Sequence, residues 1–397
     1  MPKYNITIPT DVYFILNRLC ECGYTAHIVG GCVRDMLIGK APTDYDITTD
    51  ATPEEIKTAF SDFRTVDTGI KHGTVTLIYN GAPYEITTYR IEGAYSDNRH
   101  PDSVSFTRNL SLDLSRRDFT VNAMCADKDG NLTDLYGGAE HLSAGVISAV
   151  GCAKKRFSED ALRILRAIRF SATLGFKLDA ETAKAAFECV SLLDNISVER
   201  IYTELYKLIC GEYAYRVISE YGDIIKKVLP ELSTLILPPS DRFGAASVNV
   251  RLASLFALGA ENPEAAYDGA MRRLHTDTKT RVAGACALKY LSYPLETESD
   301  ALKLLFLVGD EWAEFTAQLK KTVLGEGGGS RLLDLAKCSG KPYKFSDLSV
   351  SGAGFVASGL VGENIGRGMK AVLFAIMDGV IDNTVEEILR YIKKLKL

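Results

Sequence analysis

Short apolar segments separated by polar turns dominate the N-terminal part of the chain. Segments of this length, alternating with amphipathic stretches, predict a small sheet with a few covering helices. Thr10 and Gly23 border a predicted helix over 11–21, and Thr52 has the position of a cap for another. Asn80-Gly81 is a typical hairpin turn. Strands are predicted over 25–29, 43–48, 64–66, 74–79 and 84–90, and a short helix over 33–38.

The pattern changes near residue 152. From there on, apolar residues recur at helical spacing and strand signals are few. Pro230 and the pair Pro238-Pro239 punctuate this helical region, and the glycine-rich run 325–329 interrupts it again. We therefore predict an α+β head with a small mixed or antiparallel sheet, followed by an all-α remainder.

A glycine pair follows the first predicted strand, and two aspartates lie within the second. Gly31 and its neighbour let the backbone turn tightly and approach a ligand, with Arg34 close behind. Because side chains alternate along a strand, Asp44 and Asp46 are predicted to face the same way. Two carboxylates on one face repel unless a cation lies between them, and Mg²⁺ is commonly bound by carboxylates together with substrate phosphates. An isolated D-x-D is more often a solvated strand edge, but the preceding GG-x-VRD run favours a nucleotidyl-transfer site.

Composition narrows the class of protein without identifying it. The 397 residues are 46% hydrophobic and 24% charged, as in ordinary globular proteins, and exceed the usual length of one domain. The formal net charge of −5 does not suggest a nucleic-acid partner, so any basic surface must be local. Nine scattered cysteines without a C-x-x-C pair indicate reduced thiols in a cytoplasmic protein. The first residues lack signal-peptide character, and no apolar run reaches membrane-spanning length.

The glycine turn and the two aspartates together resemble a known family. The run GGCVRDMLIG, continued by TDYDITTDATPEEI, is similar to motif A of the class II tRNA nucleotidyltransferases, the CCA-adding enzymes of the polymerase β superfamily. Bacterial poly(A) polymerases share this motif. The resemblance implies that Gly31 and Arg34 cradle a triphosphate while Asp44 and Asp46 bind catalytic Mg²⁺. It also implies four regions: a polymerase β-like nucleotidyltransferase head (1–145), a neck with a base-reading helix (146–215), a body (216–324) and a tRNA-contacting tail (325–397).

A second motif lies at 113–123, where RRDFTVNA places two arginines beside an aspartate. This combination suits a nucleotide, because guanidinium groups bind phosphate and a carboxylate accepts from a ribose hydroxyl. A bare RRD is usually a surface ion-pair cluster, but with FTVNAM attached it resembles motif B of the family. The resemblance assigns phosphate and ribose contacts to Arg117 and Asp118, with Asn122 as a further candidate.

The segment SEDALRILRAIRF is predicted to be a helix capped by Ser158. The usual explanation of its polar arc is a solvated face. Cytosine and adenine, however, present an amino donor beside a ring-nitrogen acceptor, which an Asp–Arg pair can match, whereas guanine and uracil present the reverse. The segment also resembles the EDxxR motif of the family, and 195–201 resembles the stabilising motif that follows it. The implied base readers are Asp160 and Arg163, with Arg166 and Arg169 as nearby phosphate or nucleotide contacts.

Three further features of the sequence are a carboxylate with two possible roles, a long polar segment and a hinge motif that departs from the family. Glu85 is either a third carboxylate near the metals or a paired edge residue. The polar segment 91–106 is long for a connection, and in CCA-adding enzymes a loop here helps to admit ATP. The hinge motif that begins at Asp134 departs from the family, which usually has Asp where this chain has His141 and Arg where it has Ser148.

The resemblance implies template-independent addition of CCA to the 3′ end of tRNA, from CTP and ATP, with Mg²⁺ as cofactor and release of pyrophosphate. The expected partners are tRNA, ATP and CTP, without a membrane, for a monomer or homodimer. The nearest rival is a bacterial poly(A) polymerase, which would lengthen RNA with ATP alone. Narrower and different rivals are an enzyme that adds only A or only CC, and an RNA-binding protein with an inactive transferase head.

Overall fold

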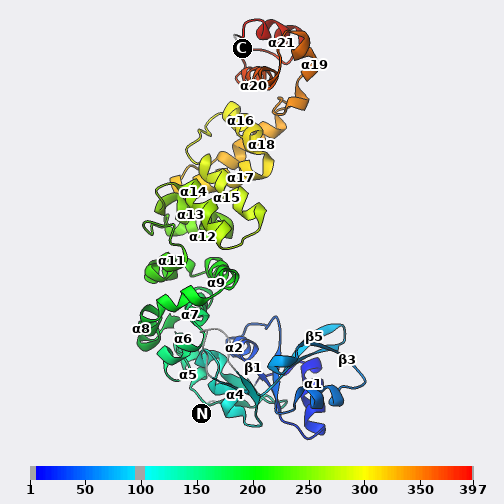
Figure 1. Cartoon of the computed structure of the whole chain (residues 1–397), viewed down its shortest axis with the longest axis vertical. Helices are drawn as coiled ribbons and strands as arrows, with labels where there is room; N and C mark the ends of the chain where they lie inside the picture. Colours follow the sequence, from blue (N-terminus) through cyan, green and yellow to red (C-terminus); the bar gives the residue numbers. More distant parts are fainter. Residues whose placement is uncertain (1–5, 94–102, 396–397) are drawn as a thin grey trace. The chain divides into compact units, whose positions relative to one another are not determined.

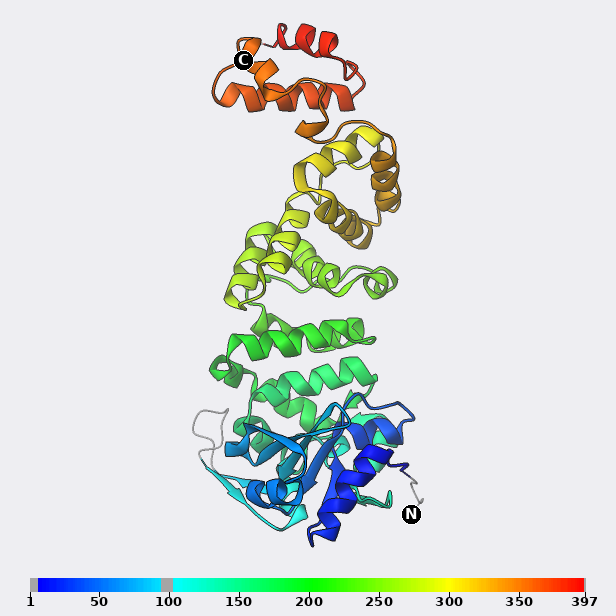
Figure 2. The same cartoon turned by 90° about the vertical axis from the view of Figure 1, so that its right-hand side faces the viewer.

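The computed structural model describes residues 6–93 and 103–395, so most of the predicted long loop over 91–106 lies outside the described residues. The chain forms two compact units, the first ending at Val228 and the second covering Leu229–Leu397. The first combines a sheet with helices and the second is helical, which confirms the predicted fold class (Figures 1 and 2). The finer boundaries of head, neck, body and tail stay a prediction. In the described ranges, no helix is long and apolar enough to cross a membrane.

A seven-stranded mixed sheet forms the core of the first unit, with the strand order β3-β4-β5-β2-β1-β8-β9. Strands β2 and β5 pair in parallel, and the other neighbours pair antiparallel. Asn80 and Gly81 join β4 to β5 with φ values of 48° and 80°, which confirms the predicted hairpin turn. The strands are β1 (Ala26–Val29), β2 (Asp46–Thr49), β3 (Arg64–Gly69), β4 (Thr74–Tyr79), β5 (Ala82–Thr88), β8 (Met124–Ala126) and β9 (Leu132–Asp134).

The apolar face of the sheet carries a row of fully buried isoleucines, Ile28, Ile47 and Ile86, that are neighbours across β1, β2 and β5. Helix α1 (Thr10–Glu21) contacts β1, and α3 (Pro53–Ala59) contacts β4 and β5. Thr52 begins α3 with a complete capping box, as its sequence predicts. Because side chains alternate along a strand, Asp46 and Ile47 point to opposite faces of the sheet. The site lies on the face of Asp46.

Several predicted boundaries differ from the structure, and two of the differences fall on acidic site residues. Strand β2 begins at Asp46, where its ladder with β5 begins, so Asp44 lies in the preceding loop. The predicted single helix over 158–170 is two helices, α6 (Ala153–Glu159) and α7 (Leu162–Leu174). Asp160 lies between them in an extended conformation with φ −136° and ψ 103°. Its side chain accepts from the backbone N–H of Leu162, a local bond that competes with a continuous helix, and Ser158 is inside α6 rather than a cap.

Further short elements complete the first unit around α7. Helix α7 packs against α9 (Val198–Cys210). The paired strands β6 (Arg90–Glu92) and β7 (Val104–Phe106) flank the undescribed segment. The remaining elements are α2 (Gly31–Leu37), η1 (Ile70–His72), α4 (Leu110–Ser115), η2 (Thr120–Asn122), α5 (Gly138–Ala144), β10 (Val146–Ile147), β11 (Lys177–Leu178), α8 (Ala180–Glu188), η3 (Val190–Asn195), α10 (Ala214–Glu220) and α11 (Gly222–Val228).

The second unit packs its helices around an apolar core of its own. One buried cluster draws on helices from α16 to α21 and includes Leu304, Leu333, Phe355, Val372 and Ile388. Helix α17 ends at Gly325, which has a left-handed conformation with φ 80°. The helices are α12 (Ser240–Ala245), α13 (Val248–Gly259), α14 (Pro263–Arg273), α15 (Thr278–Lys289), α16 (Glu298–Val308), α17 (Asp310–Leu324), α18 (Gly329–Cys338), η4 (Phe345–Asp347), α19 (Gly352–Ala357), α20 (Glu363–Met377) and α21 (Val385–Ile392).

Candidate active site

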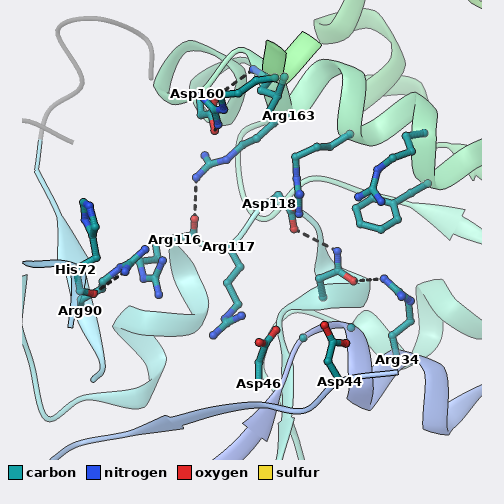
Figure 3. Close-up of a pocket in the computed structure, with 18 residues that line it drawn as sticks. Arg34, Asp44, Asp46, His72, Arg90, Arg116, Arg117, Asp118, Asp160 and Arg163 are labelled. Atoms are coloured by element: carbon teal, nitrogen blue, oxygen red, sulfur yellow. Dashed lines mark hydrogen bonds and ion pairs between the residues drawn. The ribbon is translucent and has the colours of Figure 1, made fainter. Parts of the chain in front are cut away.

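A pocket of about 690 Å³ in the first unit contains all of the predicted site residues (Figure 3). It draws side chains from α2, β2, the α4–η2 region, α7 and α9, which are far apart in sequence. Eight arginines and four aspartates line it, so a chain with negative net charge holds a strongly basic pocket. Its size suits a single nucleotide. The predicted residues that it brings together are Gly31, Arg34, Asp44, Asp46, Arg117, Asp118, Asp160, Arg163, Arg166 and Arg169.

Of the two glycines in the turn, Gly30 has the stricter conformational requirement. Gly30 has φ 82°, and a Cβ there would lie 3.4 Å from the Arg117 Nη1 atom. Gly31 is the first residue of α2, and a Cβ at that position would make an ordinary contact of 3.6 Å with Arg34. The sequence assigns the tight turn to both glycines. In the structure, the positive φ and the close approach of Arg117 both occur at Gly30.

Asp44 and Asp46 lie next to each other on the floor of the pocket, although only Asp46 belongs to β2 (Figure 3). Partial desolvation raises the pKa of Asp46, and the charge of Asp44 raises it further, while Arg117 opposes this. Glu85 is the direct neighbour of Asp46 across the β2–β5 ladder, and its charge also raises the pKa of Asp46. Negative charge is therefore concentrated where the pocket meets the sheet.

The donor set at this point fits a hard divalent cation. The residues are carboxylates whose mutual repulsion a cation would relieve. Within the described ranges, no group of three or more His, Cys, Asp or Glu side chains is close enough to bind a metal. Glu85 does not line the pocket and lies on an interior strand, so it is an electrostatic neighbour of Asp46 rather than an edge residue. Two carboxylates with space for phosphate oxygens are the arrangement that Mg²⁺ commonly uses.

The side chain of Asp113 binds both arginines of motif B. Its carboxylate is fully buried and accepts from Arg116 at 2.7 Å and 3.1 Å and from Arg117 at 3.1 Å. Burial alone would raise the pKa of Asp113, but the two guanidinium groups hold it below its usual value. Arg117 is thereby directed toward Asp46 (Figure 3). The i,i+3 and i,i+4 spacing of Asp113 to Arg116 and Arg117 is visible in the sequence, whereas its complete burial and its bond to the Arg90 N–H depend on the fold.

Asp118 is bound by the protein on both carboxylate oxygens. Oδ2 accepts from Arg166 Nε at 2.9 Å and Nη2 at 2.6 Å, and Oδ1 accepts from the N–H of Phe119 and from Asn122 Nδ2. Asn122 in turn accepts from Arg34 Nη1 at 2.7 Å. Motif B is therefore connected to both the glycine turn and α7. A ribose hydroxyl that binds Asp118 has to displace one of these partners.

The two predicted base readers are held by other residues rather than by each other. Asp160 Oδ2 accepts from Arg200 Nη2 at 3.1 Å. Arg163 donates to the carbonyls of Arg156 and Arg116 and to Glu159 at 2.8 Å. Both side chains line the pocket, with Arg163 only 8% exposed (Figure 3). Each side chain is therefore held in its orientation by partners within the protein.

Sequence reasoning missed several residues that line the pocket. Arg200 lies on α9, in the segment to which the resemblance gave only a stabilising role. Arg90 donates to the carbonyl of His72 at 2.6 Å, and both line the pocket opposite α7. Phe170 is the aromatic lining residue on α7. Arg200 and Phe170 lie within segments that resemble family motifs, but their place in the pocket, like that of Arg90 and His72, becomes evident only in the folded arrangement.

Both positions where the hinge motif departs from the family contact Thr120 of motif B. The Thr120 hydroxyl and His141 Nδ1 are hydrogen-bonded at 2.8 Å. The Thr120 backbone N–H donates to the carbonyl of Ser148 at 2.9 Å. Asp134 accepts from the N–H groups of Gly138 and Ala139 at the start of α5. The hinge region is thus joined to the site through the hydrogen bonds of Thr120.

Two known family models match the chain, almost entirely within the first unit. A family model described as the poly A polymerase head domain matches residues 26–148, and one described as the probable RNA and SrmB-binding site of polymerase A matches residues 175–235. With the mixed sheet and the site above, these matches define a nucleotidyltransferase head with an adjoining RNA-binding region.

Relatives that match nearly the whole chain identify the family more closely. The chain is 35% identical to a CCA-adding enzyme of Leuconostoc mesenteroides, over 97% of this chain and 96% of the relative. It is 36% identical to a CCA-adding enzyme of Lactobacillus johnsonii, over 95% of each chain. The chain belongs to the family of CCA-adding enzymes. A crystal structure of the Bacillus stearothermophilus CCA-adding enzyme in complex with CTP is similar, with a TM-score of 0.75, 29% identity and 98% of both chains covered.

Proposed function

We propose that the chain adds CCA to the 3′ end of tRNA from CTP and ATP, releases pyrophosphate and uses no nucleic-acid template. The observation that carries this function is the single pocket that combines paired carboxylates, a cluster of arginines and the Asp160–Arg163 pair. The relatives that match the chain over nearly their full lengths are named CCA-adding enzymes. A similar structure was solved in complex with CTP. A membrane plays no part in this proposal, and either a monomer or a homodimer is compatible with it.

The arginines of the pocket bind the triphosphate in this proposal. Arg34, Arg166 and Arg169 present guanidinium groups, which suit phosphate oxygens because their N–H donors are planar and permanently charged. Arg117 extends toward Asp46 and binds a phosphate close to the carboxylates. Asp118 accepts from the ribose after giving up one of its present partners.

Asp44 and Asp46 would hold Mg²⁺. When bound, a divalent cation there supplies Lewis-acid stabilisation of the phosphate oxygens and lowers the pKa of a coordinated hydroxyl. Arg117 and the arginines of α7 orient the phosphates relative to the 3′-hydroxyl of tRNA, so that the hydroxyl attacks the α-phosphate and pyrophosphate leaves.

Asp160 and Arg163 select the base. The Asp160 carboxylate accepts from the amino group of cytosine or adenine, and Arg163 donates to the adjacent ring nitrogen. Guanine and uracil present a carbonyl beside an N–H, so acceptor would meet acceptor and donor would meet donor. Leaving such buried groups unpaired costs roughly 1–3 kcal/mol each, which is sufficient for strong rejection.

The decisive experiment incubates the purified protein with tRNA that lacks CCA and supplies CTP, ATP or both. We expect two residues added with CTP alone and a complete CCA end, with no further growth, with both nucleotides. Long products with ATP alone would indicate a poly(A) polymerase instead, and a stop after CC or addition of only A would indicate a partial enzyme. D46A should abolish incorporation while tRNA binding persists, whereas D129A, a change at an exposed turn, should retain activity. Retained incorporation by D46A would refute the metal assignment.

A further inference from the structure

The ring of Phe170 is the common contact of three arginines in the pocket. The guanidinium carbons of Arg169, Arg34 and Arg166 lie 4.1 Å, 5.3 Å and 5.5 Å from its centroid. Arg166 and Arg169 share α7 with Phe170, but Arg34 comes from α2, beside the glycine turn. The ring is 6% exposed and packs edge-on against Phe119, with centroids 5.8 Å apart and planes at 81°. Phe170 therefore has a fixed position against which the arginines can be placed.

Three guanidinium groups at one ring repel each other unless the protein compensates for their charge. Burial lowers the pKa of Arg169, and the charges of Arg166 and Arg34 lower it further. The carboxylate of Glu204 raises it. Each arginine has an acidic partner of its own: Asp118 for Arg166, Asp35 for Arg34 and Glu204 for Arg169. Those partners use N–H donors and neutralise charge, which reduces what remains for a phosphate.

An aromatic face attracts a cation without using its N–H donors. The ring carries partial negative charge on its face, and a guanidinium that lies over it keeps its edge available for hydrogen bonds. An aliphatic side chain of similar size fills the same volume but gives no such attraction. The chemical difference between Phe and Leu at this position is therefore a test of what the ring does beyond packing.

We propose that Phe170 is a positioning residue that holds Arg34, Arg166 and Arg169 together as one phosphate-binding cluster. This inference rests on the proposed function, since it deepens the triphosphate site of the same pocket. Phe170 acts through the arginines and not through the base, so its loss weakens the binding of CTP and ATP equally. Selection against UTP and GTP, which depends on Asp160 and Arg163, stays unchanged.

The experiment compares F170L and F170Y, which keeps the ring, with the wild-type full-length protein. The probe is inorganic tripolyphosphate, which has no base or ribose, and its binding is measured by isothermal titration calorimetry. We expect F170L to bind it about tenfold more weakly and F170Y to stay within about twofold of wild type. In steady-state assays, F170L should raise KM for CTP and ATP by a similar factor with a much smaller change in kcat. F256L is the matched control, because Phe256 is fully buried in the second unit and packs edge-on against Tyr267.

Several results would overturn the inference: wild-type tripolyphosphate affinity in F170L, an F170Y variant no better than F170L, or a wild-type protein that does not bind tripolyphosphate. Thermal melts identify a folding defect in F170L, in which case F170M gives the same non-aromatic comparison. The outcome is separable from the proposed function. If the wild type binds tripolyphosphate in a ring-dependent manner but does not extend tRNA, the function fails and the inference holds. If the wild type completes CCA while F170L matches it in KM and affinity, the function holds and the inference fails.

Discussion

Replacing Asp113 with Asn removes the buried charge that holds the motif B arginines. Asp113 has no exposed surface, and its carboxylate accepts from Arg116, Arg117 and the N–H of Arg90. Breaking a buried ion pair by removing one partner costs about 3–5 kcal/mol. The side chains of Arg116 and Arg117 stay 17% and 20% exposed, so water can partly replace the lost acceptor. We therefore expect D113N to lose about 3 kcal/mol of unfolding free energy, at the lower end of that range.

Thermal and urea unfolding followed by circular dichroism measure this loss, which corresponds to a fall in Tm of about 6–12 °C for a unit of this size. The pH dependence gives a second test. Because the ion pairs hold the pKa of Asp113 in the folded state below its unfolded value, its contribution is complete above about pH 4 and is lost as pH falls through the folded pKa. The deficit of D113N should be constant near neutrality and shrink in acid. The control is D223N, at an 81% exposed surface pair. Stability equal to that of D223N, or a deficit that persists in acid, would refute the reasoning.

Two further predictions concern the glycine turn and the carboxylates. G30A should lose about 2 kcal/mol of stability, because φ 82° is strained for alanine and its Cβ lies 3.4 Å from Arg117, whereas G31A at the start of α2 should be nearly neutral. Equal losses in urea unfolding would contradict this. D44N should lower the pKa of Asp46 toward its usual value by removing a like charge, with E85Q giving a smaller shift in the same direction. Carboxyl ¹³C NMR titration measures both shifts, and an unchanged or higher pKa in D44N would exclude the electrostatic account.

Local signals in the sequence predicted the local structure well. Asn80-Gly81 forms the expected hairpin because both positions need positive φ, and Thr52 forms its capping box because Glu55 is three residues on. The candidate site residues were found because each lies in a short motif with its own chemistry, and the pocket contains all of them. Their individual roles stay predictions.

The errors and omissions arise where tertiary partners decide the structure. Asp44 was expected in a strand, but β2 has a ladder partner only from Asp46 onward. Asp160 was expected on a helix, but its side chain bonds to the Leu162 N–H and to Arg200 on α9, which favours a break. Arg200 was missed for the same reason, because it pairs with Asp160 across the fold and no local spacing reveals that contact. Asp113 is different: its i,i+3 and i,i+4 spacing to Arg116 and Arg117 was visible in the sequence, and only its complete burial depends on the fold.

If Asp160 and Arg163 select the base as proposed, selection starts from groups that already have partners within the protein. Asp160 is bound by Arg200, Arg163 by Glu159 and Asp118 by Arg166. A nucleotide therefore gains only the difference between its own hydrogen bonds and those that it displaces or shares. A matching base can join these pairs without leaving a charge unpaired, because it offers a donor to Asp160 and an acceptor to Arg163. A mismatched base would place an acceptor at Asp160 and a donor at Arg163, so in the proposed arrangement it would form neither hydrogen bond and would bind more weakly than a matching base.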